Sequence, residues 1–121
     1  MWKKIMIDEG YSISYAIMWN PETNETKQVC IFDMNDPRNE NEEVRNMSLD
    51  EKALEEYRKK HGIIVESCKV KVIKGRTLPI GYTGIVKSIK SYTDNYGRWI
   101  ADYVYFTSGE KINIKNCVRI G

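Results

Sequence analysis

The stretch Trp99-Ile100-Ala101-Asp102-Tyr103-Val104-Tyr105-Phe106-Thr107 is rich in aromatic and β-branched residues, which favour β-strands. Successive side chains of a strand point to opposite faces, so the stretch divides into two sets. One set is Trp99, Ala101, Tyr103 and Tyr105, and the other is Ile100, Val104 and Phe106. We expect Trp99, Tyr103 and Tyr105 to fill a hydrophobic core.

Shorter β-prone stretches flank this strand and are separated by glycine-containing turns. They are Cys68–Val72, Gly84–Tyr92, Lys111–Lys115 and a closing segment with Val118 and Ile120. Five short strands at this spacing predict a small, strongly bent antiparallel barrel.

The first third of the chain predicts an antiparallel hairpin. Ser12–Trp19 and Lys27–Met34 both alternate, and Asn20–Asn24 between them has the composition of a turn. Lys3–Ile7 is a candidate third strand. Because an isolated hairpin is only marginally stable, this one must pack against another element or another copy.

A polar segment and one helix connect the hairpin to the barrel. Asn35–Asn46 has too little apolar content for a core element, so we expect a linker or surface loop. Ser48 and Glu51 match a capping box, which predicts a helix from Leu49 to His61 that ends at Gly62.

These elements predict an α+β fold with an N-terminal antiparallel hairpin, one helix and a C-terminal small SH3-like antiparallel β-barrel. We place a hairpin-loop-helix lobe at residues 1–66 and a barrel lobe at 67–121, packed as one compact unit. The chain has 121 residues, of which 41% are hydrophobic and 30% charged. A core of this size is modest, so self-association would add stability.

Composition also predicts the cellular setting. No apolar run is long enough to span a bilayer, and Met1–Gly10 lacks the order of a secretory signal. The three cysteines are widely spaced and include no CxxC pair, which predicts reduced core residues instead of a disulfide framework or a zinc site. We expect a soluble cytoplasmic protein without membrane, metal or cofactor.

Charge is distributed unevenly along the chain. Residues 1–67 contain nine Lys/Arg and fourteen Asp/Glu, and residues 68–121 contain ten and three, so the halves carry −5 and +7. The C-terminal half is therefore the candidate for anion binding. The alternative is that oppositely charged lobes attract one another or keep the surface soluble.

The sequence offers no catalytic motif. It has no nucleophile elbow, no paired Cys and His with an orienting carboxylate, no HExxH and no phosphate-binding glycine pattern of the Walker or Rossmann type. We therefore predict a binding protein and not an enzyme.

Two loops of the basic half are candidate binding segments. Lys74–Gly84 combines three glycines with two cations, a composition that suits phosphate, and Ser91–Trp99 combines aromatic rings with an amide and a guanidinium. The alternative is that the glycines shape turns and the aromatic residues fill the core. The candidate ligand residues in these loops are Arg76, Tyr82, Tyr92, Asn95 and Arg98.

Part of the basic half resembles a known barrel type. Val70–Gly84 followed by Ile85–Ile89 resembles the opening of an SH3-like barrel of the KOW type, with a basic strand, a glycine-bearing loop and an apolar strand. Such barrels often bind DNA or RNA, and they also serve as protein-contact modules, so the fold leaves both functions open.

The whole chain resembles the phage-encoded Thoeris anti-defence sponges. The resemblance rests on Ser12–Ile17, Glu55–Lys59, Lys74–Gly81 and Tyr103–Phe106. It implies a homo-oligomer, dimer or higher, in the host-cell cytoplasm. Such an oligomer sequesters cyclic ADP-ribose-type immune signals between subunits without degrading them, and some members also take up cyclic oligonucleotides.

The resemblance also suggests site residues. The family uses an aromatic residue and an asparagine on the barrel, which points to Asn95 with Tyr82 or Tyr92, since no phenylalanine occupies the expected place. The family's arginine near the helix end corresponds to Arg58. For the remaining cation, Lys111 and Arg98 are alternatives. A DNA- or RNA-binding module acting through the basic face remains the alternative function, with a protein-interaction module third.

Overall fold

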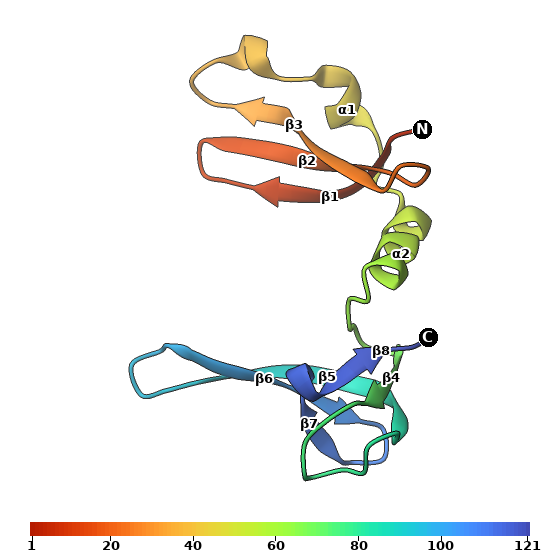
Figure 1. Cartoon of the computed structure of the whole chain (residues 1–121). Coiled ribbons are helices and arrows are strands. Elements are labelled where there is room, and N and C mark those ends of the chain that lie inside the picture. Colours follow the sequence, from red (N-terminus) through yellow and green to blue (C-terminus); the bar gives the residue numbers. More distant parts are fainter. The chain divides into compact units, whose positions relative to one another are not determined.

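The computed structural model describes all residues from Met1 to Gly121, and its contacts divide the chain into unit 1, Met1–Tyr57, and unit 2, Arg58–Gly121. Each unit contains one antiparallel sheet, so the fold is α+β (Figure 1). The division lies within helix α2 (Glu51–Lys60), whereas the sequence placed a boundary at 66/67. No helix is long and apolar enough to cross a membrane.

Unit 1 is built on a three-stranded sheet in the order β1-β2-β3. The strands are β1 (Lys3–Glu9), β2 (Ile13–Asn20) and β3 (Glu25–Asp33), which confirms the predicted hairpin and its third strand. One face packs against α2 through Trp19, whose ring lies edge-on to that of Tyr57 at 5.6 Å. Alternate residues of β2 pack on the other face against Val44.

The prediction that Asn35–Asn46 is a loop is wrong, because this segment contains two short helices. They are the 3-10 helix η1 (Pro37–Asn39) and the α-helix α1 (Glu42–Asn46). The side chain of Asn41 accepts a hydrogen bond from Val44 N and so caps α1 at its start. At its end, the buried Lys4 ammonium donates to the carbonyl oxygens of Val44, Arg45 and Met47. Local composition could not indicate a helix that depends on a lysine from β1.

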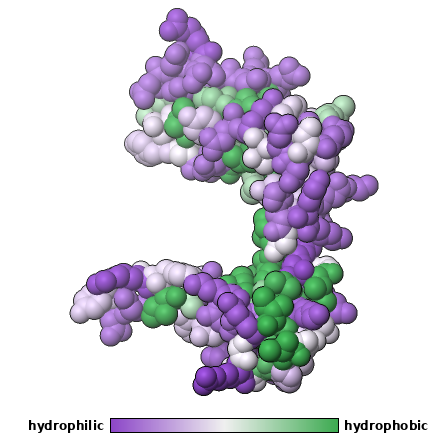
Figure 2. All heavy atoms as spheres, in the orientation of Figure 1, coloured by the Kyte–Doolittle hydropathy of each residue, from purple (hydrophilic) through white to green (hydrophobic).

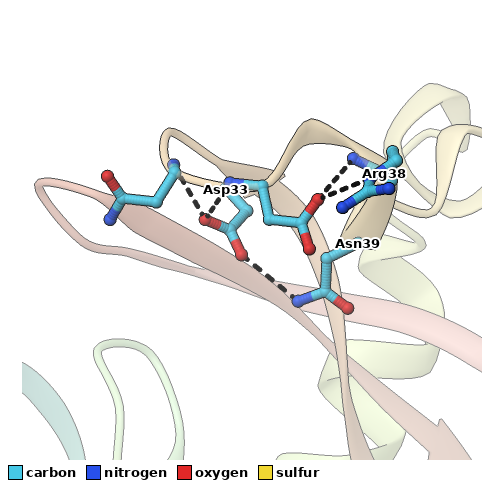
Figure 3. A network of polar contacts seen from close by, with 5 residues as sticks. Asp33, Arg38 and Asn39 are labelled. Carbon is cyan, nitrogen blue, oxygen red and sulfur yellow. Dashed lines mark hydrogen bonds and ion pairs between the residues drawn. The ribbon is translucent and has the colours of Figure 1, made fainter.

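Carboxylates fix the chain between β3 and α1 (Figure 3). Asp33 accepts hydrogen bonds from the side chain of Asn39 and from the backbone N–H groups of Asn35 and Asp36. These bonds, the one from Asn39 above all, lower the pKa of Asp33 below its usual value. The guanidinium Nε of Arg38 lies 3.3 Å from a carboxylate oxygen of Asp36 and forms an ion pair with it.

Helix α2 begins two residues later than predicted. The side chain of Asp50 accepts from Ala53 N at 3.0 Å, so Asp50 and not Ser48 caps the helix. At the other end, Gly62 N and Ile63 N donate to the carbonyls of Lys59 and Arg58, which confirms the predicted stop.

Unit 2 contains a five-stranded sheet in the order β7-β6-β5-β4-β8. Its strands are β4 (Lys69–Val72), β5 (Thr83–Thr93), β6 (Trp99–Phe106), β7 (Lys111–Asn113) and β8 (Cys117–Arg119), and the 3-10 helix η2 (Ile114–Asn116) joins the last two. Strands β7 and β8 are its two edges, so the sheet does not close as a barrel would. The central core residues are Val70, Val72, Val86, Val104 and Phe106.

All three cysteines are free, and the prediction that they are core residues holds for two of them. Cys68 and Cys117 are buried in the core of unit 2, and Cys30 is half-buried in β3. Burial in apolar surroundings raises the pKa of the Cys117 thiol, which disfavours its reactive thiolate form.

Candidate functional site

Unit 2 has a cavity of about 330 Å³ beside its edge strand β7. Its walls come from the β4–β5 loop, from β6, from β7 and from η2. The lining residues are Gly75, Thr77, Tyr103, Lys111, Ile112, Asn113 and Asn116.

The β4–β5 loop is held at the cavity by η2. The backbone N–H groups of Ile73 and Lys74 donate to the carbonyl oxygen of Asn116 at 2.8 and 3.4 Å. Gly75 has φ +105°, and a Cβ there would lie 2.9 Å from the Asn116 side-chain nitrogen. The positive φ therefore favours glycine at position 75, and a Cβ there would also displace the Asn116 amide.

The cavity combines a cation, an aromatic ring and amides. The Lys111 ammonium lies 5.4 Å from the ring centroid of Tyr103. The side-chain oxygen of Asn113 accepts from Lys115 N at 3.0 Å, which fixes the orientation of that amide. Such a set can pair with a phosphate, stack on a base and hydrogen-bond to a base edge or a ribose hydroxyl.

The strand register places further tyrosines and lysines on the face that borders the cavity. Tyr103 lies opposite Lys90 and Asn113, and Tyr105 lies opposite Lys111. Directly opposed residues of an antiparallel pair share a face. The Tyr92 ring lies edge-on to that of Tyr103 at 5.3 Å, and its hydroxyl is hydrogen-bonded to that of Tyr105.

The expectation that Trp99, Tyr103 and Tyr105 fill the core is wrong. Trp99 is 54% exposed and the two tyrosines are half-buried, whereas Val104 and Phe106, on the face opposite to the tyrosines, are fully buried. The alternation of β6 was predicted, but apolar character alone did not indicate which of its two faces is buried.

Three of the proposed ligand residues lie at or near the cavity. Lys111 lines it, and Arg76 is exposed between the lining residues Gly75 and Thr77. Tyr92 lies beside it, with its ring centroid 5.9 Å from the Lys111 ammonium.

The other four lie elsewhere. Tyr82 packs edge-on to Phe106 at 5.5 Å, and Arg58 lies in α2. Asn95 and Arg98 belong to the β5–β6 turn, where Arg98 lies 3.9 Å from the carboxylate of Asp94. The cavity contains residues of the 74–84 loop and none of 91–99, so the two loops do not enclose it together.

Sequence reasoning proposed Lys111 and, within the Lys74–Gly84 loop, Gly75 and Thr77, but it missed the other four lining residues. The missed residues are Tyr103, Ile112, Asn113 and Asn116. Asn113 lies in the predicted β-prone stretch Lys111–Lys115 and Asn116 follows it directly, and no spacing or motif distinguished either amide. Only the pairing of β6 with β7 and the contact between the β4–β5 loop and η2 bring them together.

The hydroxyl contact between Tyr92 and Tyr105 predicts an altered titration. This hydrogen bond is the main cause that raises the pKa of Tyr92 above its usual value of about 10. The pKa of Tyr92 is therefore higher in the folded chain than in the unfolded chain. Its contribution to stability is complete at pH values below the unfolded-state pKa and is lost as the pH rises through the folded-state pKa. Replacing Tyr105 by phenylalanine should bring the pKa of Tyr92 down towards 10. An NMR titration of the Tyr92 ring would measure this, and an unchanged pKa would contradict the assigned cause.

The geometry of unit 2 thus joins one lysine, one ring and two amides in a single cavity. Comparison with models of protein families, with curated proteins and with solved structures finds no match to this chain.

Proposed function

We propose that this chain is a non-catalytic binding protein that sequesters a cyclic ADP-ribose-type nucleotide signal. The observation that carries the proposal is the cavity in which Lys111, Tyr103, Asn113 and Asn116 meet. Its volume of about 330 Å³ is within the range of small-molecule sites, which starts at roughly 300 Å³.

The chemistry of the ligand matches that of the cavity. A cyclic ADP-ribose isomer has two phosphates, an adenine and ribose hydroxyls. Lys111, with Arg76 on the adjoining loop, supplies positive charge for the phosphates, and the Tyr103 ring offers a stacking surface for the base. The amides of Asn113 and Asn116 supply donors and acceptors for the ribose or the base edge.

The lining residues favour capture over turnover. They include no carboxylate, imidazole or thiol, the groups that most often act as general acid, general base or nucleophile. The captured nucleotide would therefore leave the protein chemically unchanged.

Sequestration also requires high affinity, because each binding site removes only one signal molecule. A nanomolar dissociation constant corresponds to about −12 kcal/mol. The cavity lies beside an edge strand, so a second copy of the chain could close it and add contacts. We propose a homo-oligomer in the cytoplasm of the host cell, with unit 2 as an SH3-like module whose edge strands are joined by η2.

Isothermal titration calorimetry with a cyclic ADP-ribose isomer tests this proposal. We expect binding by the unmodified chain and at least a tenfold weaker affinity for Lys111→Met, because a charge-assisted phosphate contact is lost. Lys87→Met is the matched control, since it removes an equal charge from an exposed position of β5 that does not line the cavity. Absence of binding, or an equal loss in both variants, would overturn the proposal.

A further inference from the structure

Three tyrosines and two lysines share one face of unit 2 beside the cavity. We call it the tyrosine–lysine face, and its residues are Lys90, Tyr92, Tyr103, Tyr105 and Lys111. Tyr103 and Lys111 also line the cavity, so the face continues the cavity along the β5–β6 hairpin (Figure 1).

The two lysines lie close to tyrosine rings whose hydroxyls meet. The ammonium of Lys90 is 5.1 Å from the ring centroid of Tyr105. That of Lys111 is 5.9 Å from the ring centroid of Tyr92. The hydroxyls of Tyr92 and Tyr105 are hydrogen-bonded to each other. Each ring of this hydroxyl pair therefore has an ammonium group beside it.

Both positive charges act on the same hydroxyl. The hydrogen bond with Tyr105 is the main cause that raises the pKa of Tyr92, and the ammonium groups of Lys111 and Lys90 act in the opposite direction. The two lysines thus converge on one pair of hydroxyl groups.

No carboxylate neutralises these two lysines. Neither takes part in an ion pair of the chain, and both are exposed. Asp102 lies opposite Ser91 and accepts a hydrogen bond from its hydroxyl, which places this carboxylate on the other face of the hairpin. Unit 2 as a whole has thirteen Lys/Arg and four Asp/Glu, a net charge of +9, which adds to the attraction of an anion.

The tyrosine–lysine face is accessible from the solvent. Tyr92 is 40% exposed, and strand β4 pairs with β5 only at Thr83–Ile85, so it does not reach Lys90. Figure 2 shows hydrophilic residues along the β5–β6 hairpin beside a smaller hydrophobic area. A polar ligand can therefore reach the hydroxyl pair.

A hydroxyl pair between two ammonium groups suits an oxyanion. One hydroxyl of the pair donates to the other, and the second keeps a hydrogen that it can donate to a ligand. Ammonium groups pair with phosphate as point charges. Because Lys90 and Lys111 lie against different rings, a ligand with two phosphates can engage both lysines.

We infer that the tyrosine–lysine face binds the diphosphate group of a nucleotide, with Lys90 and Lys111 as cations and the hydroxyl pair of Tyr92 and Tyr105 as donor. The nucleoside part would then occupy the adjoining cavity. The inference rests on the proposed function for the identity of the nucleotide, and it adds Lys90, Tyr92 and Tyr105 to the residues that select it. A nucleoside monophosphate would leave part of this site empty and should bind more weakly.

A titration of the ¹⁵N-labelled full chain with inorganic pyrophosphate, followed by NMR at constant ionic strength, tests the anion site alone. We expect saturable shifts of backbone signals at positions 90–92 and 103–105. The affinity for pyrophosphate should be about fivefold higher than that for sulfate, which has no second phosphate for the second lysine.

Two variants with matched controls identify the groups that bind. Lys90→Met should weaken pyrophosphate binding about tenfold, because a charge-assisted contact is lost. Lys71→Met removes an equal charge from an exposed position of β4 and should have little effect. Tyr92→Phe keeps the ring but removes the hydroxyl and should weaken binding about fivefold. Its control is Tyr96→Phe, since Tyr96 is 83% exposed in the β5–β6 turn.

Comparison of ADP with AMP then tests the selection of a nucleotide. The unmodified chain should bind ADP about tenfold more tightly than AMP, because only ADP supplies the second phosphate. Lys90→Met should remove this preference and leave the affinity for AMP unchanged, whereas Lys71→Met should retain the preference.

Four results would overturn the inference. They are no saturable binding of pyrophosphate, an equal affinity for sulfate, an equal effect of Lys90→Met and Lys71→Met, and an equal affinity of the unmodified chain for ADP and AMP. Pyrophosphate binding that depends on Lys90, together with no binding of a cyclic ADP-ribose isomer, would instead overturn the proposed function and leave the anion site in place.

Discussion

Replacing Phe106 by alanine should lower the free energy of unfolding of unit 2 by about 3–5 kcal/mol, because the change leaves a cavity in the core. Phe106 is 1% exposed and packs among the buried valines of unit 2. Its ring also lies over Gly84, where a Cβ would come within 2.6 Å of it. The glycine at position 84 is thus explained by packing against Phe106 and not by phosphate binding.

Urea denaturation followed by far-ultraviolet circular dichroism would measure the loss, and hydrogen exchange would assign it to unit 2. Phe32→Ala is the control, since Phe32 of β3 is 43% exposed and its truncation should cost under about 1 kcal/mol. An equally small loss for Phe106→Ala would contradict the assigned core.

Replacing Lys4 by methionine should destabilise unit 1 by about 2–4 kcal/mol. Lys4 is 3% exposed, and its ammonium donates to three carbonyl oxygens at the end of α1, at 2.8–3.2 Å. Methionine fills similar space but donates nothing, so these acceptors lose a charged partner, and a buried polar group without a partner is costly. The positive charge at the C-terminal end of the helix is lost as well.

Hydrogen exchange resolved by peptide would detect this change as faster exchange in residues 42–47 and in β1. Lys3→Met is the matched control. Lys3 is partly exposed, and its ammonium lies 4.0 Å from Asp50, a separation at which an exposed ion pair contributes little. Equal effects of the two substitutions would show that the buried ammonium has no special role.

The strands and the long helix could be predicted because local patterns determine them. Alternation in Ser12–Trp19 and Trp99–Thr107 matches β2 and β6, and Gly62 marks the end of α2. The cap at Asp50 was missed because Ser48 and Glu51 offered an equally good local pattern.

Features that depend on distant residues could not be predicted. Helix α1 is completed by Lys4, about forty positions earlier in the chain. The cavity joins Gly75 and Asn116 through contacts that no local pattern encodes. Trp99 was assigned to the core on its apolar character, although its ring contacts the polar side chains of Asp102 and Lys115.

Recovery of intact nucleotide from the protein tests the proposed function most directly. The full chain would be incubated with a cyclic ADP-ribose isomer, freed of unbound ligand and heat-denatured, and the supernatant analysed by chromatography. Sequestration predicts release of the unchanged nucleotide in an amount comparable to that of the protein. A cleaved product would indicate an enzyme, and no recovered nucleotide would contradict capture in the cavity around Lys111.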